Sequence, residues 1–362
     1  MLSDSRKISI RQAVLIFLTI TFTPSIRLIP TYAAQRAKQA AWLSPIISTV
    51  LLLLLGLVWQ VLYKRYKDCS LMEIYCDITG SIAGRIIAVI YLLWMILLTA
   101  LYIRYFAIRL VGAIYPNTSI SIFIISMLVI VTYTLRFGLP VLARFNEVVL
   151  PFLVLAFFLL FLMMIPNIKT EMLTPVSLRS ILPVVRASVG STGILAYFTF
   201  IFIFGNRINN KESIKKSSAE MSMFLTAALV LIQISILGTF GYRVAQRTQL
   251  PFLVAVKQIS VMNIFEKVES IVVSVWVLSD FVIISFFITC ALSILGFLLK
   301  LRDTKPLISI YVIFSYFLCM LLANNVFEME KLSDAFAIPG NIILGFVIPA
   351  VMLLVGKIRR KV

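Results

Sequence analysis

The sequence predicts an all-α polytopic membrane protein with ten transmembrane helices. Of its 362 residues, 61% are hydrophobic, and the mean hydropathy is +1.04. Soluble domains are less apolar, and runs of about 20 apolar residues, the length that spans a bilayer, recur along the chain. The 33 lysine and arginine residues lie mainly between these runs, where they set topology and contact lipid headgroups. The net charge of +18 therefore indicates membrane lipid as a partner, and no nucleic acid is expected.

The ten segments are expected to form one transmembrane domain, residues 1–362, built from two halves of five. The first half, about 8–165, contains segments at about 8–34, 42–63, 84–114, 120–135 and 147–165. The second half, about 185–355, contains segments at about 185–205, 221–242, 264–299, 307–322 and 338–355. No clear internal sequence repeat is visible, so the two halves are inferred from segment order alone.

The first segment carries a helix-breaking stretch where an uninterrupted apolar helix would be expected. Thr23, Pro24 and Ser25 lie near its middle, and Pro30 follows. Each proline removes a backbone donor and clashes with the carbonyl one turn earlier, so the helix is expected to kink or unwind. Unwound backbone at membrane depth persists only inside protein or beside a wet cavity. The stretch therefore predicts a binding site near the bilayer midplane, and a simple proline kink is the alternative.

The sixth segment carries a second weak point, between Gly190 and Tyr197. Glycine admits unwound conformations at low steric cost, and freed amides at the start of a half-helix can hold a carboxylate. The alternative is a face of small residues that packs against another helix. Segments one and six are the first helices of the two halves. Paired breaks in these positions favour an inverted-repeat transporter fold.

The distribution of basic residues places both termini in the cytoplasm. With the N-terminus inside, 20 lysine and arginine residues fall in inner loops and chain ends, and 11, including Arg109, fall outside. Arg27 and Arg104 remain within the membrane and complete the 33. An excess of basic residues in cytoplasmic loops is the usual determinant of orientation.

Ionisable residues inside the membrane are costly and need a role. Asp280 is the only acid well inside an apolar segment. It is interpreted as a contact for a substrate ammonium group, as an ion or proton site, or as a structural partner of Arg27 or Arg104. Arg27 either pairs with a substrate carboxylate or with Asp280, or extends to the membrane interface. Arg104, between Tyr102 and Tyr105, is interpreted as a counter-ion or an interfacial anchor.

Two further charged residues, Arg144 and Glu147, lie at the inner end of the fifth segment. They are interpreted as an inner gate or, alternatively, as a structural ion pair. The chain has no histidine, no Ser/His arrangement, no metal-ligand cluster and no glycine-rich phosphate loop. The protein is therefore not expected to be an enzyme, and no cofactor or metal is expected.

Four stretches of the sequence form a recognisable set. Arg144 and Glu147 precede an apolar run that contains Pro151, and Glu266 and Glu269 precede Trp276. The first segment ends in the triplet 28–30, Leu-Ile-Pro, and the stretch 206–211 after the sixth segment is basic. With the segment number and charge spacing, these stretches resemble the GerAB-type endospore germination permease family. That family comprises the B subunits of germinant receptors, within the amino acid–polyamine–organocation superfamily.

The resemblance implies a LeuT-like five-plus-five fold with broken helices 1 and 6. It implies a sensor of a small-molecule germinant, typically an amino acid, in the inner membrane of a dormant spore. The implied partners are the germinant receptor A subunit and a lipoprotein C subunit. The chain departs from the family in having Thr23, Pro24 and Ser25 where a glycine-rich break is usual.

On this fold, the ligand is expected between the breaks of segments one and six, walled by segments three and eight. Helical spacing places Trp94 and Leu98 on one face of segment three, and Ile283 and Phe287 on one face of segment eight. Walls this apolar suit Ala, Val or Leu. The predicted substrate-binding set is Thr23, Pro24, Ser25, Trp94, Leu98, Gly193, Ala196, Tyr197, Ile283 and Phe287.

Two alternative functions remain open from the sequence. One is an ion-coupled secondary transporter (permease) of amino acids, in which Asp280 is the proton or cation site. The other is a non-binding membrane scaffold, although a scaffold has no need of polar, broken helices in lipid.

Overall fold

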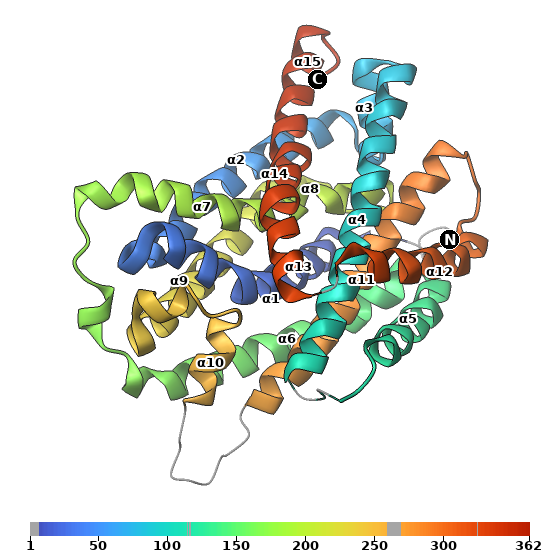
Figure 1. Cartoon of the computed structure of the whole chain (residues 1–362). Helices are drawn as coiled ribbons and strands as arrows, with labels where there is room; N and C mark the ends of the chain where they lie inside the picture. The colour runs from blue at the N-terminus through green and yellow to red at the C-terminus, as the bar shows by residue number, and fades with distance from the viewer. Residues whose placement is uncertain (1–6, 114, 116, 259–268, 324) are drawn as a thin grey trace.

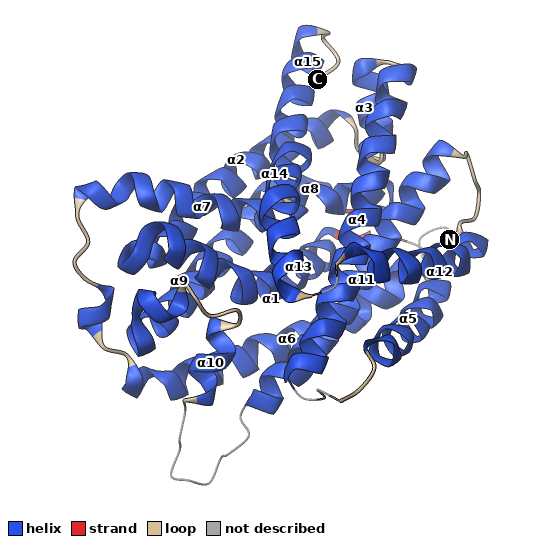
Figure 2. Cartoon of the chain, viewed as in Figure 1, coloured by secondary structure: helices blue, strands red, loops and turns tan. Residues whose placement is uncertain are grey.

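The computed structural model describes residues 7–113, 115, 117–258, 269–323 and 325–362, and it is almost wholly helical (Figure 2). Its α-helices are α1 (Ile10–Ala37), α2 (Ser44–Arg65), α3 (Leu71–Thr79), α4 (Ser81–Ala113), α5 (Ile120–Phe137), α6 (Leu139–Met164), α7 (Ile181–Leu195), α8 (Tyr197–Ile201), α9 (Ile214–Ala245), α10 (Pro251–Lys257), α11 (Glu269–Leu298), α12 (Lys305–Leu322), α13 (Val326–Leu332), α14 (Ile338–Ile342) and α15 (Ile348–Ile358). The 3₁₀ turns are η2 (Lys38–Leu43), η3 (Ile165–Asn167), η4 (Thr170–Leu173), η5 (Leu178–Ser180), η6 (Phe202–Arg207) and η7 (Lys211–Ser213). Two π-helical turns, η8 (Ser333–Ala337) and η9 (Ile343–Val347), and two strands, β1 (Ile8–Ser9) and β2 (Ile208–Asn209), complete the set.

Nine helical stretches of the described residues are long and apolar enough to cross a membrane. The first, Ile10–Arg65, is 56 residues long and contains both α1 and α2, which η2 joins. Since one crossing needs about 20 residues, this stretch accounts for two crossings, and the total is consistent with ten segments. The chain is an integral membrane protein. The predicted end of segment three at Ile114 and the start of segment eight at Ile264 lie outside the described residues.

The helices pack in two groups (Figure 1). In one group, α1 and α2 contact α7 and α9; in the other, α4 and α5 contact α11 and α12. In chain order, each group combines matching helices from the two predicted halves. Helix α1 also contacts α6 and α11, so it joins the two groups.

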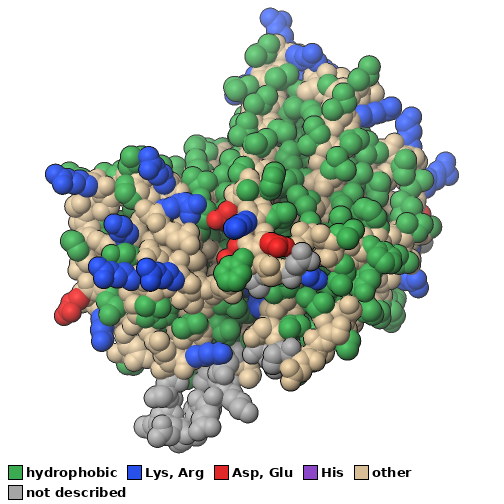
Figure 3. Space-filling model, in the orientation of Figure 1, with side chains coloured by type: hydrophobic (Ala, Val, Ile, Leu, Met, Phe, Trp, Pro, Cys, Tyr) green, Lys and Arg blue, Asp and Glu red, His purple; other side chains and the backbone are tan. Residues whose placement is uncertain are grey.

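The outward faces of these helices are apolar. Ile82 on α4, Leu321 on α12 and Ile358 on α15 are each 80% exposed or more. Figure 3 shows apolar side chains gathered over the upper and right-hand parts of one face, with basic side chains over its left-hand part and along the outer edges. Such a surface suits contact with lipid and not with water.

The first segment differs from the expectation of an unwound stretch. Helix α1 runs without interruption through Pro24 and Pro30, so the predicted break in helix 1 is wrong for this structure. Twenty of its 28 residues are buried, which leaves the helix little freedom to bend away from its neighbours. Membrane helices tolerate proline when the surrounding protein supports the freed backbone groups.

The sixth segment is interrupted, but beyond its glycines. Helix α7 ends at Leu195, Ala196 forms a turn, and α8 is followed by η6, in which Phe204 has non-helical backbone angles. Gly190 and Gly193 lie within α7. A Cβ atom at Gly190 would lie 2.5 Å from the Tyr32 ring, so this glycine serves close packing of α7 on α1. The alternative interpretation, a small-residue packing face, therefore describes the glycines.

Segment ten, from α13 to α15, contains the two π-helical turns η8 and η9. A π turn inserts one residue into the helix and is often found at functional sites. Gly345 in η9 packs against Ala196, since a Cβ atom there would lie 2.6 Å from the Ala196 carbonyl oxygen. Thr199 donates a 2.6 Å hydrogen bond to the Gly345 carbonyl. The irregular parts of segments six and ten therefore face each other.

Candidate functional site

A cleft with two lobes opens at the end of α1 that is remote from the N-terminus. Both lobes are lined by Arg27, Leu28, Tyr102, Tyr105, Gln249 and Glu330. The lobe toward α7 spans about 770 Å³ and the lobe toward α10 about 860 Å³, each counted with the open space at its mouth. We call this region the main cleft.

Three charged side chains form a buried cluster at the base of the main cleft. Arg27 Nη1 lies 3.2 Å from Asp280 Oδ1, and Arg109 Nη2 pairs with Asp280 Oδ2. The Arg27, Arg109 and Asp280 side chains are 6%, 8% and 2% exposed. The Trp276 ring centroid lies 5.9 Å from Arg27 Cζ and 5.5 Å from Arg109 Cζ. We call this arrangement the ion cluster.

The ion cluster has two cations for one anion. Breaking a buried ion pair is costly because it leaves a charge without compensation. In this cluster the two arginines share one carboxylate, so their positive charge is only partly compensated. Arg109 Nη1 is buried and has no hydrogen-bond partner among the described residues. The cluster can therefore accept a further anionic group.

The two lobes of the main cleft differ in charge. Beyond the shared residues, the α10 lobe is lined by Arg109 and Lys257, whereas the α7 lobe is lined by Asp334. Glu330 lines both. The α10 lobe thus carries two further basic groups, and the α7 lobe carries one further acid.

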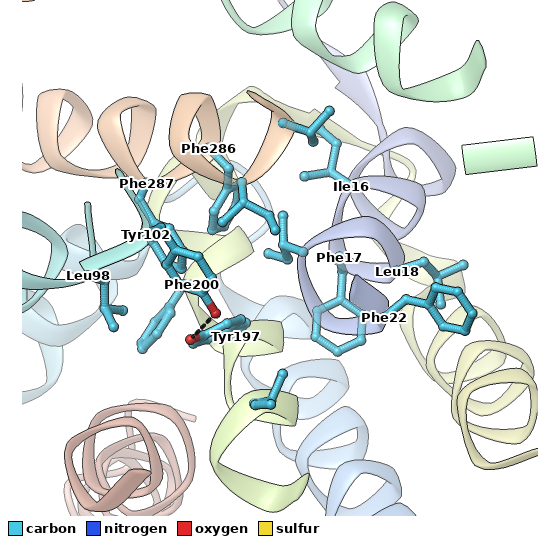
Figure 4. Packing of buried hydrophobic residues seen from close by; sticks show 14 of the residues in the cluster. Ile16, Phe17, Leu18, Phe22, Leu98, Tyr102, Tyr197, Phe200, Phe286 and Phe287 are labelled. Carbon is cyan, nitrogen blue, oxygen red and sulfur yellow. Dashed lines mark hydrogen bonds between the residues drawn. The ribbon is translucent and has the colours of Figure 1, made fainter. Parts of the chain in front are cut away.

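Two tyrosines close the floor of the main cleft. The Tyr102 and Tyr197 hydroxyls form a 2.9 Å hydrogen bond, drawn as a dashed line in Figure 4. Asn341 Nδ2 donates to the Tyr197 hydroxyl at 3.4 Å, and Trp94 Nε1 donates to Asn341 Oδ1 at 2.9 Å. The Tyr102 ring stacks on Phe287 with centroids 5.3 Å apart. Segments three, six, eight and ten all contribute to this floor.

Most of the predicted substrate-binding residues lie at or below this floor. Leu98, Ile283 and Phe287 are fully buried, as are Thr23 and Ala196. Pro24 and Ser25 are buried on α1, Gly193 packs against Ile338, and Trp94 is tied to Asn341. Tyr197 is the one member of the set that lines the main cleft. Tyr197 and Phe287 contact each other with ring centroids 5.3 Å apart, whereas Thr23 faces Phe157 and Trp276 in a separate crevice.

The charged predictions fall in different places. Arg27 and Asp280 are paired, whereas Arg104 points Nη1 toward Met320 Sδ at 3.4 Å. The second partner of Asp280 is Arg109, which the pattern of basic residues had predicted to lie in an outer loop. The sequence did contain a signal that Arg109 belongs to the site. Arg109 lies on the same helix face as Tyr102 and Tyr105, at helical positions i, i+3 and i+7.

The inner-gate prediction is not matched by an ion pair. Arg144 and Glu147 are both exposed, and among the described residues no ion pair joins them. Glu147 instead accepts a 3.3 Å hydrogen bond from Gln12 Nε2. Both residues lie near the start of α6, and their side chains are exposed there. Glu266, in the other family stretch, lies outside the described residues.

The end of the molecule opposite the main cleft is closed. Strand β1 pairs in parallel with β2, with Ile8 opposite Ile208. Lys7 lies 3.8 Å from Asp68, and Lys211 Nζ donates to the Lys67 carbonyl. The N-terminal segment, the end of segment six and the loop before α3 are therefore held together. The structure is open at one end of α1 and closed at the other.

Two solved structures share the fold of this chain. The chain superposes with a TM-score of 0.64 on a Na⁺-coupled sialic acid symporter described in a substrate-bound outward-open state, at 11% identity over 92% of this chain and 78% of that one. It superposes with a TM-score of 0.66 on MhsT in complex with L-phenylalanine, at 10% identity over 97% of this chain and 88% of that one. These similarities establish the LeuT-like fold.

Sequence relatives come from Bacillus subtilis (strain 168). The chain is 24% identical to Spore germination protein KB, over 79% of this chain and 77% of that protein. It is 22% identical to Spore germination protein YndE over 100% and 99%, and 23% identical to Putative spore germination protein YfkT over 93% and 92%. A family model described as "Spore germination protein" matches residues 7–327. The chain therefore belongs to the spore germination permease family, integral membrane proteins with a transporter fold.

Proposed function

We propose that this protein is the B subunit of a germinant receptor and that it senses an amino acid germinant in the main cleft. The observation that carries the proposal is the ion cluster, in which Arg27 and Arg109 share Asp280 at the base of the cleft. Membership of the family supports a role in spore germination. The transporter fold supports the binding of a small ligand between its helices.

The ligand's carboxylate pairs with Arg109 in this proposal. The guanidinium group matches a carboxylate in geometry and charge, and Arg109 Nη1 has no hydrogen-bond partner among the described residues. A ligand carboxylate would also balance the excess positive charge of the ion cluster.

The ligand's ammonium group faces the acidic side of the cleft, near Glu330 and Asp334. A zwitterion then has each charge opposite a complementary group. The aliphatic lining, including Leu28 and Ile194, suits a small apolar side chain such as that of Ala, Val or Leu. The complex of MhsT with L-phenylalanine supports an amino acid ligand for this fold.

The deeper predicted residues act in a second step of the proposal. Ser25, Leu98 and Phe287 are reached only when the Tyr102–Tyr197 pair separates. Ligand binding favours one of two arrangements of the floor because its contacts differ between them. The arrangement of segments six and ten then carries the change to partner subunits.

The proposal also includes the wider setting. The partners are the receptor A subunit and the lipoprotein C subunit, and the location is the spore inner membrane with both termini in the cytoplasm. The main cleft then faces outward. The two halves, about 8–165 and 185–355, act as inverted repeats, which the pairing of matching helices supports.

Binding isotherms on the purified chain in lipid nanodiscs test this function. L-alanine, L-valine and L-leucine are titrated, and saturable binding of at least one is expected. Spores that carry Tyr197→Phe, which removes the hydroxyl from the floor, should respond more weakly to the same amino acid. Absence of saturable binding, together with normal germination of the Tyr197→Phe spores, would reject the proposal.

Ion-coupled transport is a second candidate, favoured by the buried Asp280 carboxylate at the base of an open cleft. In this case the protein should take up amino acid into proteoliposomes under a pH or sodium gradient. In Asp280→Asn protein that remains folded at the assay temperature, uptake should no longer depend on the gradient. Binding without uptake under either gradient would leave the sensor function and exclude this one.

A further inference from the structure

Helices α5 and α12 pack together and present apolar side chains outward (Figure 1). On α12, Ile310, Ile313 and Phe317 are 65%, 59% and 61% exposed, and on α5, Val129 and Tyr133 are 62% and 67% exposed. Such faces lie against lipid acyl chains. Since successive crossings alternate in direction, α5 ends and α12 begins on the side of the membrane that holds both chain ends.

Two basic side chains flank the junction of these helices. Arg136 lies in the last turn of α5, and its Nη2 donates a 3.4 Å hydrogen bond to Ser309 Oγ on α12. Lys305 is the first residue of α12 and precedes Ser309 by one helical turn, on the same face. Arg136 and Lys305 are exposed, and neither forms an ion pair with a described residue. We call this group of three residues the basic junction.

The loop between α11 and α12 adds positive charge beside the basic junction. Lys300 and Arg302 are exposed there and also form no ion pair within the described part of the chain. Asp303, the acid of this loop, accepts a 3.0 Å hydrogen bond from the Lys305 backbone nitrogen. The junction and its loop therefore combine four basic groups with one carboxylate, which already serves the start of α12.

We propose that the basic junction binds one anionic phospholipid from the adjoining leaflet. The lipid phosphate accepts hydrogen bonds from the Arg136 guanidinium and the Lys305 ammonium group. The acyl chains lie along the exposed faces of α5 and α12. A phospholipid fits better than free phosphate because apolar surface adjoins the cations on both helices. An anionic headgroup fits better than a zwitterionic one because the ammonium of a zwitterion would lie among basic side chains.

The dimensions of α12 fit this arrangement. Phe317 lies about 18 Å from Lys305 along the helix, at 1.5 Å per residue. Half of the hydrocarbon core of a bilayer is about 15 Å thick. The acyl chains of a lipid held at the basic junction therefore extend beside Ile310, Ile313 and Phe317, on the side of the molecule away from the main cleft.

The end of α2 offers a comparison with the same charge. Lys64 and Arg65 lie in its last turn, on the same side of the membrane, and both are exposed. They are consecutive on one helix, so their side chains point about 100° apart. The basic junction instead places its two cations on different helices, on either side of Ser309. A lipid site therefore predicts stronger lipid selection at the basic junction than at the end of α2.

Photo-crosslinking of the full chain in nanodiscs tests the proposal. The nanodiscs contain equal amounts of phosphatidylglycerol and phosphatidylethanolamine. Benzoylphenylalanine replaces Ile313 in one protein and Leu57 in another; both positions are exposed and lie about 12 Å from a basic helix end. Mass spectrometry identifies the cross-linked lipids. The ratio of phosphatidylglycerol to phosphatidylethanolamine adducts at Ile313 should exceed the ratio at Leu57 about fivefold, the effect of one basic residue on an anionic lipid.

Two double variants make the test specific. Arg136→Gln with Lys305→Gln should lower the ratio at Ile313 to that of the nanodisc lipids. Lys64→Gln with Arg65→Gln removes the same charge and should leave the ratio at Ile313 unchanged. All four side chains are exposed, so both proteins are expected to fold. Excess inorganic phosphate should have no more effect than chloride at the same ionic strength.

Three results would overturn the proposal. Equal adduct ratios at Ile313 and Leu57 would show that any basic helix end enriches anionic lipid to the same degree. An equal fall at Ile313 in the two double variants would show that total charge, and not the basic junction, attracts the lipid. Displacement of phosphatidylglycerol by inorganic phosphate beyond the chloride control would make a free anion the occupant.

Discussion

At the scale of single residues, Asp280 holds the buried charges together. Its two carboxylate oxygens pair with separate arginines, one on α1 and one on α4, while Asp280 itself lies on α11. Three helices that are far apart in sequence thus meet at one carboxylate. A buried pair of this kind does not by itself prove high stability, but removal of the shared partner leaves two buried cations uncompensated.

Asp280→Asn should therefore destabilise the protein strongly. Breaking a buried ion pair costs about 3–5 kcal/mol, so a clear fall in the thermal unfolding midpoint in detergent is expected. The matched control is Asp303→Asn, the same change at an exposed acid, which should leave the midpoint nearly unchanged. Equal midpoints for the two variants would show that the ion cluster is not a stabilising contact.

The sequence predicted part of this site from residue type alone. Asp280 and Arg27 were identified because ionisable residues are rare inside apolar helices, and the structure places them together. Arg109 was assigned to a loop because it lies near the end of a long segment, where a basic residue usually contacts headgroups. Which of two arginines reaches an acid depends on the rotation and tilt of a helix, and these are set by tertiary packing.

At the scale of elements, segments six and ten form the irregular part of the fold. The break at Ala196 lies against η9, where Gly345 allows close approach. Gly190 and Gly193 predicted a break in segment six, but in the structure these two glycines allow close helix packing. Proline in segment one predicted a break that α1 does not have, because propensity is outweighed when a helix is buried on nearly all sides.

Gly345→Ala tests the contact between segments six and ten. The added methyl group would lie 2.5–2.9 Å from Ala196 atoms, so overpacking should cost about 1–3 kcal/mol and lower the unfolding midpoint. Gly112→Ala is the control, since no atom lies within 4 Å of the added carbon. A midpoint for Gly345→Ala as high as that of Gly112→Ala would argue against close packing here.

The pairing of β1 with β2 provides a second test at this scale. In a background without the four native cysteines, Ile8→Cys and Ile208→Cys should form a disulfide, because facing residues on paired strands have suitable Cα separations. Gly112→Cys, in the α10 lobe of the main cleft, should still react with a membrane-impermeant maleimide when the disulfide is formed. If the disulfide prevented maleimide labelling of Gly112→Cys, the structure could not be closed at the β1–β2 end while the main cleft is open.

At the scale of the whole molecule, hydropathy and charge predicted most of the architecture. Apolar runs predict the crossings and the basic residues between them predict the orientation, because both patterns depend on the membrane as solvent. The short helices α3 and α10 were not predicted, since nine or seven residues in a loop give little periodic signal. The sequence also could not show that the main cleft is open and that two tyrosines close its floor. These features belong to one conformational state, and a sequence pattern does not distinguish such states.

The predicted orientation has a direct test. Fusions of green fluorescent protein and alkaline phosphatase after Val362 and after Lys169 should behave in opposite ways. The fluorescent fusion should be bright after Val362, in the cytoplasm, and the phosphatase should be active after Lys169, outside. The reverse pattern would place the main cleft on the cytoplasmic side and remove it as an entry for external germinants.

The central claim is that the main cleft binds a ligand carboxylate at Arg109. The measurement is the affinity of the nanodisc-embedded protein for L-valine and for isobutylamine, which lacks the carboxylate, in the wild type, Arg109→Gln and Arg104→Gln. Arg104 is a matched control, a buried arginine on the same helix that contacts Met320. The wild type and Arg104→Gln should prefer L-valine, and Arg109→Gln should lose about tenfold to a hundredfold in L-valine affinity with little change for isobutylamine. Wild-type affinity for L-valine in a folded Arg109→Gln protein would contradict the account.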